Sequence, residues 1–469
     1  MSKENGIANG NGNCKHLHIA MCPWYAFGHI TSFLHLANKL AEKGHKISFF
    51  LPTNTKHRFT SHNHHPNLIT LIPITVPAVD GLPVGAETTA DVPASSRPLI
   101  MTAMDQTQDT IEFYLSSLKL DFIFFDFTEW VPKIARKHQV KSLFYSTVYL
   151  VTVAYLLPQP RNLPINSFSE EEMKKPPPGF PLPSVRLRAH EARSLAGASE
   201  AEFGGSGLSL LERVSIAFQQ CDAVCIKTCR EMEGPYCDFV QKNYRKPVLL
   251  AGPVVPELPA GQLDEYFDNW LKDFGNGSVV YCALGSECFL QKDQFQELVL
   301  GLELTGKPFL AALKLPTECS TLESALPEGF TERTKGRGIV HIDWVQQQLI
   351  LQHPSVGCFL THCGAGSLSE AIVCDCQLVM LPHAVDQSIN ARLMSLDLKL
   401  GVEIEKRDED GFFTREAVCK AVATVMEVEN EVGREVRANH AKWREFLLRD
   451  GLEEAYISGF IQSLKGILV

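Results

Sequence analysis

Short apolar segments alternate with helical segments along most of this chain of 469 residues. The segment HLHIAMCPW (16–24) predicts a strand, the apolar spacing over 30–46 predicts a helix, and ISFFLP (47–52) predicts the next strand. Strands that are apolar along their whole length and are joined by helices are typical of a parallel sheet buried on both faces. The alternation continues in the predicted strands LITLIPITV (68–76), DFIFFDF (121–127) and SLFYS (142–146), with helices at 100–119 and from about Val131.

The same alternation begins again after a proline-rich stretch, VLLAGPVVPELPAG (248–261), which we interpret as the core of a linker over 248–262. Because a single hydrophobic core stops growing near ~250–300 residues, we expect two α/β domains, over 16–247 and 263–445. The predicted strands of the second array are GSVVYCALGS (277–286), PFLAALK (308–314), GIVHID (338–343), GCFLTH (357–362) and QLVMLP (377–382), with helices at 292–304 and 346–353.

Two segments depart from this alternation. Residues 1–15 are polar and rich in Gly and Asn, so we expect a disordered tail, and they show no apolar stretch of the kind found in a signal peptide. Residues 158–200 carry many prolines and charges and include KPPPGFPLP (175–183). We expect a long irregular insertion there, and such insertions often carry function.

Composition limits the partners. A formal net charge of −10 and a pI near 5.9 argue against nucleic acid or an anionic membrane as the main partner. The longest apolar stretches, such as YLVTVAYLL (149–157), are shorter than the ~20 residues that cross a bilayer, so we expect no integral membrane association. The 14 cysteines are scattered, and we interpret them as reduced thiols of a cytoplasmic protein.

The segment FLTHCGAGSLSEAI (359–372) allows three interpretations. A dinucleotide loop needs G-x-G-x-x-G, and Gly364 and Gly366 supply only its first half. A metal site needs paired ligands at C-x₂₋₄-C or H-x₃₋₅-H spacing, and we do not favour it because Cys358 is expected mid-strand while Cys374 and Cys376 bracket Asp375 at a helix-to-strand turn. The candidate ligands nearby are Cys358, His362, Cys363, Cys374 and Cys376.

The third interpretation is a turn from strand to helix that holds an anion. The strand ends at His362, and the glycines that follow let the backbone approach a ligand closely. We expect Ser367 to be the N-cap of the helix and Glu370 to be the acid of a capping box. A helix N-terminus offers free N–H groups and partial positive charge to a phosphate. Spacing alone leaves open the alternative that Ser367 and Glu370 only cap a helix.

From Trp344 to Gln387 the chain resembles the plant secondary-product motif of family-1 UDP-sugar glycosyltransferases. The matching residues are Trp344, Gln347, HPSVGCFLTHCG (353–364), Ser367, Glu370, Pro382, Asp386 and Gln387. The similarity covers most of the chain, including FGHI (27–30), FFDF (124–127) and ALGS (283–286). The phrases HLANKLAEKGH, VDGLPVGAET, CREMEGPYCDF and NHAKWREFLL resemble the branch that adds a sugar onto a sugar already attached to a flavonoid.

This resemblance implies the GT-B fold, in which two Rossmann-like parallel-sheet domains face each other across a cleft. The N-terminal domain would bind the acceptor, the C-terminal domain would bind a UDP-sugar, and a last helix over 446–469 would return to the N-terminal domain. In such sheets, ligands bind outside the carboxyl ends of the strands. We expect a monomer.

The resemblance also assigns donor-binding roles. Trp344 would stack on uracil, and the backbone of Val345 would hydrogen-bond to the edge of the base. Gln347 and Glu370 would hold the ribose, and Asp386 with Gln387 would hold the sugar. The diphosphate would meet the helix N-terminus together with Ser286, His362 and Ser367. The full set of expected donor-binding residues is Ser286, Trp344, Val345, Gln347, His362, Gly366, Ser367, Glu370, Asp386 and Gln387.

Two motif positions depart from the wider family. Ala365 stands where Trp is usual, or Phe in the sugar-on-sugar branch, and Gly366 stands where Asn is usual, as it does in that branch. Loss of a ring at Ala365 would enlarge the donor-sugar pocket, whereas Gln387 at the last motif position goes with glucose in the family. We therefore predict UDP-glucose as the preferred donor, with measurable use of UDP-xylose or UDP-rhamnose.

For catalysis, His29 matches the family's general base and Asp126 matches the acid that orients it. An imidazole can take the proton of an attacking hydroxyl, and a carboxylate on its other nitrogen fixes the tautomer and stabilises the imidazolium. Asp121 and Glu129 are the competing acids nearby. The residues expected to contact the acceptor surround the base, and they are Trp24, Phe27 and Ile30.

The function implied is an inverting UDP-glycosyltransferase that moves glucose to a small-molecule glycoside, with the 2''-hydroxyl of a flavonoid 3-O-glucoside as the first choice. A terpenoid glycoside or an aglycone is the alternative acceptor. A non-catalytic UDP-sugar-binding protein and a nucleotide-dependent dehydrogenase are alternatives of other classes, and the incomplete G-x-G-x-x-G argues against the dehydrogenase. We expect no metal or other cofactor. The tripeptide DED (408–410) resembles a D-x-D metal motif but lies in the charged stretch EKRDEDG, which predicts a solvated loop.

Overall fold

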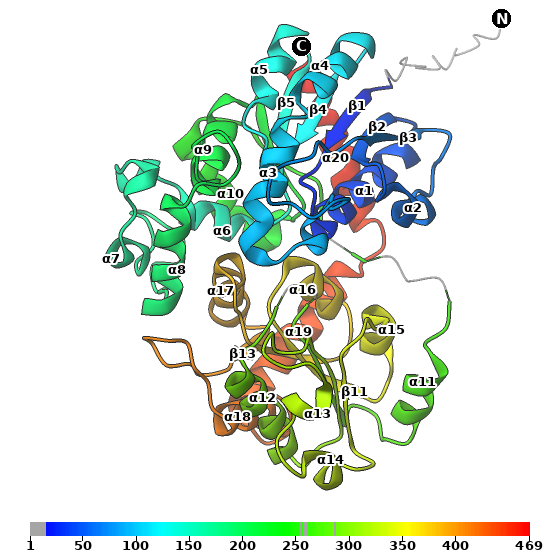
Figure 1. Cartoon of the computed structure of the whole chain (residues 1–469), viewed down its shortest axis with the longest axis vertical. Coiled ribbons are helices and arrows are strands. Elements are labelled where there is room, and N and C mark those ends of the chain that lie inside the picture. The colour runs from blue at the N-terminus through cyan, green and yellow to red at the C-terminus, as the bar shows by residue number, and fades with distance from the viewer. Residues whose placement is uncertain (1–15, 254, 257–260, 286–287) are drawn as a thin grey trace, which may run out of the picture.

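The computed structural model describes residues 16–253, 255–256, 261–285 and 288–469 (Figure 1). The tail expected over 1–15 lies outside these residues.

Within the described residues, the chain forms two entirely parallel sheets, one of seven strands and one of six. In spatial order the first sheet contains β3 (Ile69–Ile74), β2 (Lys46–Pro52), β1 (His18–Cys22), β4 (Phe122–Phe125), β5 (Lys141–Ser146), β6 (Ala223–Ile226) and β7 (Val248–Leu250). The second contains β10 (Gly338–His341), β9 (Phe309–Ala312), β8 (Val279–Ala283), β11 (Val356–Thr361), β12 (Gln377–Met380) and β13 (Gly401–Glu403). The predicted class, two Rossmann-like domains facing each other as in GT-B proteins, is confirmed.

Helices cover both faces of each sheet (Figure 1). Those that accompany the first sheet are α1 (Phe27–Glu42), α2 (Lys56–Phe59), α3 (Arg97–Asp105), α4 (Gln108–Ser117), α5 (Val131–Lys137), α6 (Leu150–Leu156), α7 (Glu170–Met173), α8 (Ala189–Glu200), α9 (Leu210–Gln220) and α10 (Arg230–Tyr244). The remaining helices are α11 (Glu265–Lys272), α12 (Lys292–Leu304), α13 (Leu322–Ala325), α14 (Phe330–Arg333), α15 (Gln347–Gln352), α16 (Ala365–Ile372), α17 (Val385–Arg392), α18 (Arg415–Met426), α19 (Glu431–Leu447) and α20 (Leu452–Ile467).

Strand β4 shows why these apolar runs fold as buried parallel strands. Its four residues are all buried. Ile123 and Phe125 join the hydrophobic cluster on one face of the sheet, whereas Phe122 and Phe124 join the cluster on the other. Successive side chains of a strand point to opposite faces, so a strand covered on both sides has to be apolar at every position.

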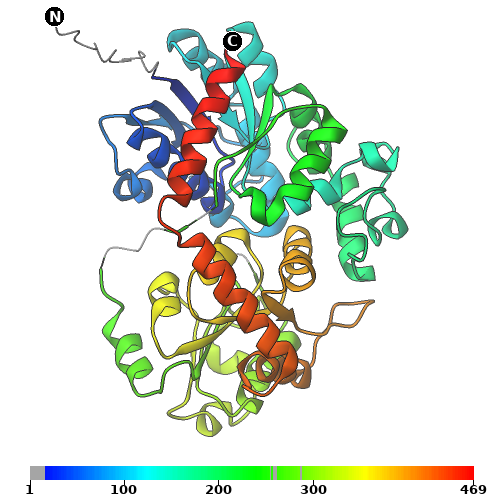
Figure 2. The ribbon, with the colours of Figure 1, turned by 180° about the vertical axis from the view of Figure 1, so that it is seen from behind.

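The C-terminal helices run along the back of the molecule, as Figure 2 shows. Helix α19 lies on the half of the molecule that contains the six-stranded sheet, which we call the second half. Helix α20 lies on the first half, which contains the seven-stranded sheet, and there Phe460 and Leu464 pack in the same cluster as residues of α1. The two helices are separated at Gly451, whose φ of 76° is in the left-handed region that glycine adopts without strain. The hydroxyl of Tyr456 in α20 donates to Glu231 at 2.6 Å.

Two predicted boundaries were wrong. Val248–Leu250, expected to begin the linker, form β7 and pair in parallel with β6, since this apolar β-branched run suits the sheet edge. The insertion over 158–200 is not irregular throughout, because it ends in the 12-residue helix α8. Its prolines all precede residue 184, so nothing in AHEARSLAGASE breaks a helix.

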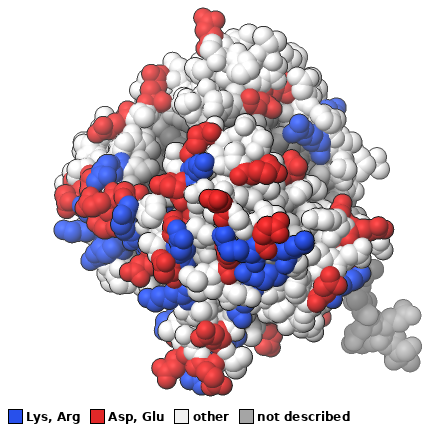
Figure 3. Space-filling model, turned by 60° about the horizontal axis from the view of Figure 1, so that its bottom comes forward, with Lys and Arg blue, Asp and Glu red and all other residues white. Residues whose placement is uncertain are grey.

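On the face shown in Figure 3, acidic and basic side chains are interspersed rather than gathered by sign. Across the described ranges, no helix is both long and apolar enough to span a membrane. The cysteines of the described residues are free thiols.

Polar contacts between α6 or α10 and the second half tie the two halves together. Thr152 of α6 donates to Asn390 Oδ1 of α17 at 3.1 Å, and the Tyr149 hydroxyl that precedes α6 lies 3.5 Å from Ser369 Oγ of α16. Tyr236 of α10 donates to Asp397 at 2.8 Å, just beyond α17. The start of α6 therefore touches both helices that border the cleft on the other side.

A buried acid holds this start of α6. Glu233 is 0% exposed, and its Oε1 accepts a hydrogen bond from the backbone N–H of Val151 at 2.8 Å. Burial raises the pKa of Glu233 to about 7, although backbone hydrogen bonds from Val151 and Leu150 act in the opposite direction. In the folded protein this carboxyl therefore keeps its proton at a pH where the unfolded chain has lost it.

Replacing Glu233 with Gln should change how stability depends on pH. Because the pKa of Glu233 is raised in the folded state, its contribution to the free energy of unfolding is complete below pH 4.5 and is lost as pH rises through 7. Since Gln does not titrate, the Tm difference between E233Q and the wild type should move in favour of E233Q from pH 5 to pH 8, with a slope in free energy of ~1.4 kcal/mol per pH unit below pH 7. The same substitution at the exposed Glu431 is the control. A Tm difference that stays constant across this range would contradict the assignment.

Candidate active site

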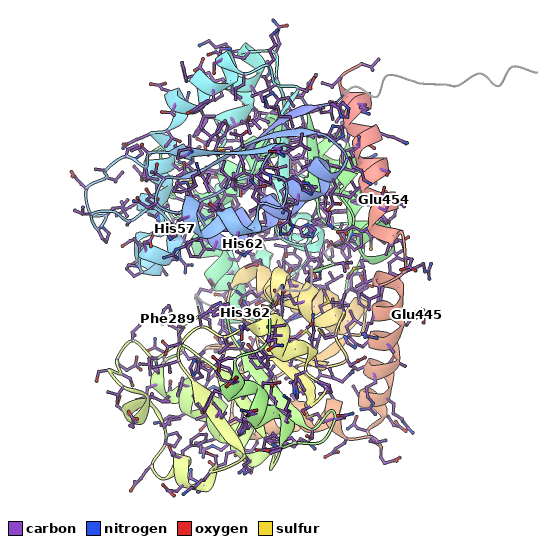
Figure 4. The ribbon with its side chains drawn as sticks, turned by 90° about the vertical axis from the view of Figure 1, so that its right-hand side faces the viewer. His57, His62, Phe289, His362, Glu445 and Glu454 are labelled. Carbon is purple, nitrogen blue, oxygen red and sulfur yellow. The ribbon has the colours of Figure 1, made fainter. Side chains whose placement is uncertain are left out.

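The candidate site lies where the strand order of each sheet reverses direction. In the first sheet this occurs between β1 and β4, and in the second between β8 and β11. Chain segments that leave such a pair of strands diverge and open a crevice for ligands. The segments leaving β1 and β4 carry His29 and Asp126, and those leaving β8 and β11 carry Gly285 and His362. In Figure 4, His362 lies at the level where the halves face each other, below His57 and His62 of the opposite half.

His29 and Asp126 form the hydrogen bond that the sequence predicts. His29 Nδ1 lies 2.7 Å from Asp126 Oδ2, and the side chains are 18% and 1% exposed. The other carboxylate oxygen, Oδ1, accepts from the backbone N–H groups of Trp24 and Phe127, both at 2.8 Å. With its carboxylate fixed at both oxygens, Asp126 holds the imidazole through Nδ1 and leaves Nε2 as the nitrogen available to a reacting group.

The two competing acids lie elsewhere. Asp121 is at the opposite end of β4, where its carboxylate accepts from the backbone N–H of His18 at 2.9 Å. Glu129 pairs with the fully buried Arg213, which also pairs with Asp105 at 2.6 Å. Among the described residues, no hydrogen bond joins either carboxylate to His29.

Two further residues contact His29 that the sequence analysis missed. The ring of Phe127 lies 5.0 Å from the imidazole, centroid to centroid, in an edge-to-face arrangement. Thr147 Oγ1 lies 3.1 Å from His29 Nδ1 and 3.4 Å from Nε2. Thr147 directly follows the carboxyl end of β5 and Phe127 lies two residues beyond that of β4, and this position was the signal that could have identified them.

On the acceptor side, Ile30 was wrongly predicted. It is 0% exposed and packs in the core cluster beneath α1, because one step along a helix from His29 turns the side chain by about 100° toward the sheet. Trp24 is also buried and packs against Phe127 and Phe203, so it supports the site through packing and does not present its ring to an acceptor. Phe27 is partly buried and packs edge-to-face on Phe59, 5.9 Å between centroids.

In the second half, three residues of the motif meet through their side chains. Gln347 Nε2 donates to Glu370 Oε2 at 2.7 Å and lies 3.1 Å from Ser367 Oγ. Gln348 donates to the other oxygen of Glu370 at 3.0 Å. Burial raises the pKa of Glu370, and the hydrogen bonds from both glutamines counteract part of that rise. Near this cluster, Trp344 is 80% exposed, which leaves its ring free as a stacking surface, whereas Val345 is buried.

Ser367 is not the N-cap that the spacing predicted. Helix α16 begins at Ala365 with Gly364 as its N-cap, and no side chain caps it. The reason is an earlier turn of the backbone, since Cys363 has φ 68° in the left-handed region, which is unusual for a residue other than glycine. Ser367 therefore lies within the first turn. A first turn without a side-chain cap keeps its N–H groups available to a ligand, and Gly366 beside them is exposed with open space around it.

His362 is held between two glycines. A Cβ on Gly285 would lie 2.7 Å from His362 Nε2, and one on Gly364 would lie 2.5 Å from it, so neither position has room for a side chain. Burial lowers the pKa of His362 to about 4, despite a backbone hydrogen bond with Ala283. The imidazole is therefore neutral near pH 7 and offers a hydrogen bond rather than a positive charge. Ser286, expected beside it, lies outside the described residues.

Asp386 and Gln387 occupy the first turn of α17. Gln387 Oε1 accepts from the backbone N–H groups of His383 at 3.0 Å and Ala384 at 2.9 Å, so half of this side chain caps the helix and its amide NH₂ remains for a ligand. Burial raises the pKa of Asp386, and His29 acts in the opposite direction. Asp386 of one half and His29 of the other are thus within electrostatic reach across the cleft.

The cysteines near the motif and the DED tripeptide, which were considered above as metal ligands, have other surroundings in the structure. Cys358, Cys363, Cys374 and Cys376 are buried free thiols, and within the ranges described no three His, Cys, Asp or Glu side chains form a metal-binding group. The DED tripeptide lies in an exposed turn, as predicted, and Asp408 also accepts hydrogen bonds from the backbone N–H groups of Ala189, at 3.2 Å, and His190, at 3.1 Å. These groups are the start of α8, so the loop caps a helix of the opposite half.

Comparisons with known proteins identify the family and the fold of the chain. Residues 236–431 match the family model described as UDP-glucoronosyl and UDP-glucosyl transferase. A cyanidin 3-O-galactoside 2''-O-xylosyltransferase of Actinidia chinensis var. chinensis is 55% identical, covering 96% of this chain and 98% of the relative. An anthocyanidin 3-O-glucoside 2''-O-glucosyltransferase of Ipomoea nil is 52% identical with the same coverage of both chains, 96% and 98%. The crystal structure of UGT73P12 from Glycyrrhiza uralensis, complexed with glycyrrhetinic acid 3-O-monoglucuronide, has a TM-score of 0.80 at 21% identity, covering 97% of this chain and 96% of that one, which shows the shared fold. The chain belongs to the UDP-glycosyltransferase family of plant enzymes and has its GT-B fold.

Proposed function

We propose that this enzyme transfers a sugar from a UDP-sugar to the 2''-hydroxyl of a flavonoid 3-O-glycoside, with inversion at the anomeric carbon. The observation that carries the proposal is the identity of 55% and 52%, along nearly the whole chain, to two enzymes named for that hydroxyl of a 3-O-glycoside. The pairing of His29 with Asp126, opposite Asp386, supports a catalytic rather than a binding role.

The proposed reaction uses His29 as the general base. Nε2 takes the proton of the acceptor hydroxyl while its oxygen bonds to the anomeric carbon and the bond from that carbon to the diphosphate oxygen breaks. The proton remains on the imidazole as UDP leaves. Asp126 keeps Nδ1 protonated at the start and stabilises the imidazolium at the end. Phe127 and Thr147, which flank His29, are placed to shape the approach of the acceptor.

For the donor, we propose that uracil stacks on the exposed Trp344 beside the backbone of Val345. The ribose hydroxyls would meet Gln347 and Glu370, whose side chains are already joined by a hydrogen bond. The diphosphate would lie at the N-terminus of α16, close to Ser367 and the neutral His362. The sugar would meet Asp386 and the amide NH₂ of Gln387.

We propose UDP-glucose as the preferred donor and UDP-xylose as a secondary one. Gln387 favours glucose, because a site built to bind a hydroxyl rejects a sugar that lacks it. Ala365, partly buried at the start of α16, leaves room where a ring would stand and acts against strict selection. Of the two relatives, one is named for xylosyl and the other for glucosyl transfer. We further propose that the enzyme is a cytoplasmic monomer.

The acceptor and donor are tested together by a mass-spectrometric screen. UDP-glucose, UDP-xylose and UDP-rhamnose are each combined with a flavonol, its 3-O-glucoside and a terpenoid glucoside. The proposal expects the fastest transfer from UDP-glucose to the 3-O-glucoside, at the 2''-hydroxyl as located by NMR of the product. Equal rates on the flavonol and its 3-O-glucoside would contradict sugar-on-sugar transfer. Faster transfer from another UDP-sugar would contradict the donor assignment, and no transfer with intact UDP binding would indicate a non-catalytic binding protein.

Asp126→Asn should lower kcat by ~10²–10⁴-fold, the range for general-base catalysis, because the imidazolium of His29 loses the carboxylate that stabilises it. The Kd of UDP should change little. Asp121→Asn is the matched control, because it removes the same charge at the far end of the same strand. Steady-state kinetics and calorimetry of UDP binding provide both quantities. Full activity of Asp126→Asn, or an equal loss in Asp121→Asn, would contradict the role given to Asp126.

We also propose that the transfer requires no metal ion, since the start of α16 and hydrogen-bond donors near it can meet the charge that develops on UDP. The rate with saturating UDP-glucose should be unchanged after dialysis against EDTA. A loss of activity that Mg²⁺ or Mn²⁺ restores would contradict this.

A further inference from the structure

Four charged side chains from the two halves meet in a buried cluster, which we call the ionic clasp. Its members are Arg188 and Glu191 at the start of α8, Arg392 at the end of α17, and Glu403 at the end of β13, and their side chains are 22%, 4%, 7% and 12% exposed. Arg392 donates to both oxygens of Glu191, at 2.9 and 3.2 Å, and pairs with Glu403. Arg188 lies 3.0 Å from Glu191 and 3.4 Å from Glu403.

The clasp is balanced in charge and depends on the closeness of the two halves. Each arginine contacts both glutamates, so removal of one member leaves a buried charge only partly compensated, which is costly at low polarity. Burial alone would raise the pKa of Glu191, but Arg392 and Arg188 bring it below its ordinary value, so the carboxylate is charged. Glu191 belongs to the insertion of 158–200, which no proposed step of the reaction uses.

The clasp is attached to the helix that carries two donor-site residues. Arg392 is the last residue of α17, and Asp386 and Gln387 lie in its first turn. Thr152 provides a second attachment to the first half, because its Oγ1 donates to Asn390 at 3.1 Å, two residues before Arg392, and lies 3.4 Å from the backbone oxygen of Asp386 in the first turn. A helix of eight residues held near both ends has little freedom to shift along or away from the N-terminal half.

A second contact fixes α8 itself. As described above, Asp408 of the loop after β13 accepts from the first N–H groups of α8, and Arg193 on the same helix reaches Glu409 at 3.5 Å on the surface. The seam formed in this way lies next to the donor site, since Lys406 of the same loop donates a hydrogen bond to the backbone oxygen of Pro382, four residues before Asp386. The seam is therefore in contact with the segment that leads into α17.

We propose that Glu191 and Arg392 are positioning residues, whose ion pair holds α17 on the N-terminal half and thereby places Asp386 and Gln387 against the sugar of the bound UDP-sugar. The inference rests on the donor-site roles proposed above for Asp386 and Gln387. UDP alone is expected to bind through Trp344, Gln347, Glu370 and α16, and the ion pairs of the clasp among the described residues involve none of these. The clasp should consequently affect the sugar of the donor but not its nucleotide.

The test compares Glu191→Gln with Glu200→Gln in the whole chain. Glu191→Gln keeps the shape of the side chain and removes its charge, and should raise the KM for UDP-glucose by about tenfold or more, since Arg392 loses half of its compensation. The Kd of UDP, by calorimetry, and the KM of the acceptor should change by less than about twofold. Glu200→Gln makes the same change at the exposed last residue of the same helix and should leave all three quantities unchanged.

Conservative variants provide the second readout. Glu191→Asp retains the charge, so its KM for UDP-glucose should show only a small part of the rise expected for Glu191→Gln. It replaces Glu191→Gln as the test if that variant does not fold. In that case the KM of Glu191→Asp for UDP-glucose should still exceed the wild-type value, with the Kd of UDP unchanged. An unchanged KM, or an equal weakening of UDP and UDP-glucose, would overturn the proposal. Asp386→Asn is measured in parallel: if it leaves the KM for UDP-glucose unchanged, the proposed donor role fails, whereas a raised KM in Asp386→Asn alone means that only the positioning role fails.

Discussion

The hydrogen bond between His29 and Asp126 joins the start of α1, which follows β1, to the loop that follows β4, and the rest of the candidate site is arranged around it. Asp126 is fixed by two backbone N–H groups as well as by His29, so its carboxylate serves both the fold and the imidazole. Because β1 and β4 are the strands at which the sheet reverses direction, these segments diverge beside the pair. In the proposed reaction, an acceptor hydroxyl reaches Nε2 in the space that they leave.

The second sheet repeats the same construction, and in the proposed function it serves the UDP-sugar. Its reversal between β8 and β11 places His362 and the uncapped start of α16 at the level where the two halves face each other. The halves are joined by α20, by the polar contacts of α6 and by the ionic clasp, which bring the two crevices together. Helix α17 carries Asp386, a proposed donor-site residue, in its first turn and the clasp residue Arg392 at its last position.

Local pattern predicted most of the strands, because apolar runs are visible in sequence, whereas the pairing of His29 with Asp126 was implied by the resemblance to the glycosyltransferase family. It failed where the outcome depends on one backbone dihedral angle or on distant contacts. The left-handed Cys363 starts α16 before Ser367, and the rotation of α1 buries Ile30. The contact of α8 with Asp408 and Arg392 joins residues about 200 positions apart, for which spacing gives no indication. The short buried strand β6 also had no flanking signal that set it apart.

The account depends most on the claim that Asp126 acts through His29 alone. A double-mutant cycle of His29→Ala and Asp126→Asn, with kcat/KM measured for the wild type, both single variants and the double variant, tests this claim directly. If the residues act as one unit, the double variant should be no slower than His29→Ala, and Asp126→Asn should have no effect once the imidazole is absent. Independent effects that multiply in the double variant would contradict the account and give Asp126 a role of its own.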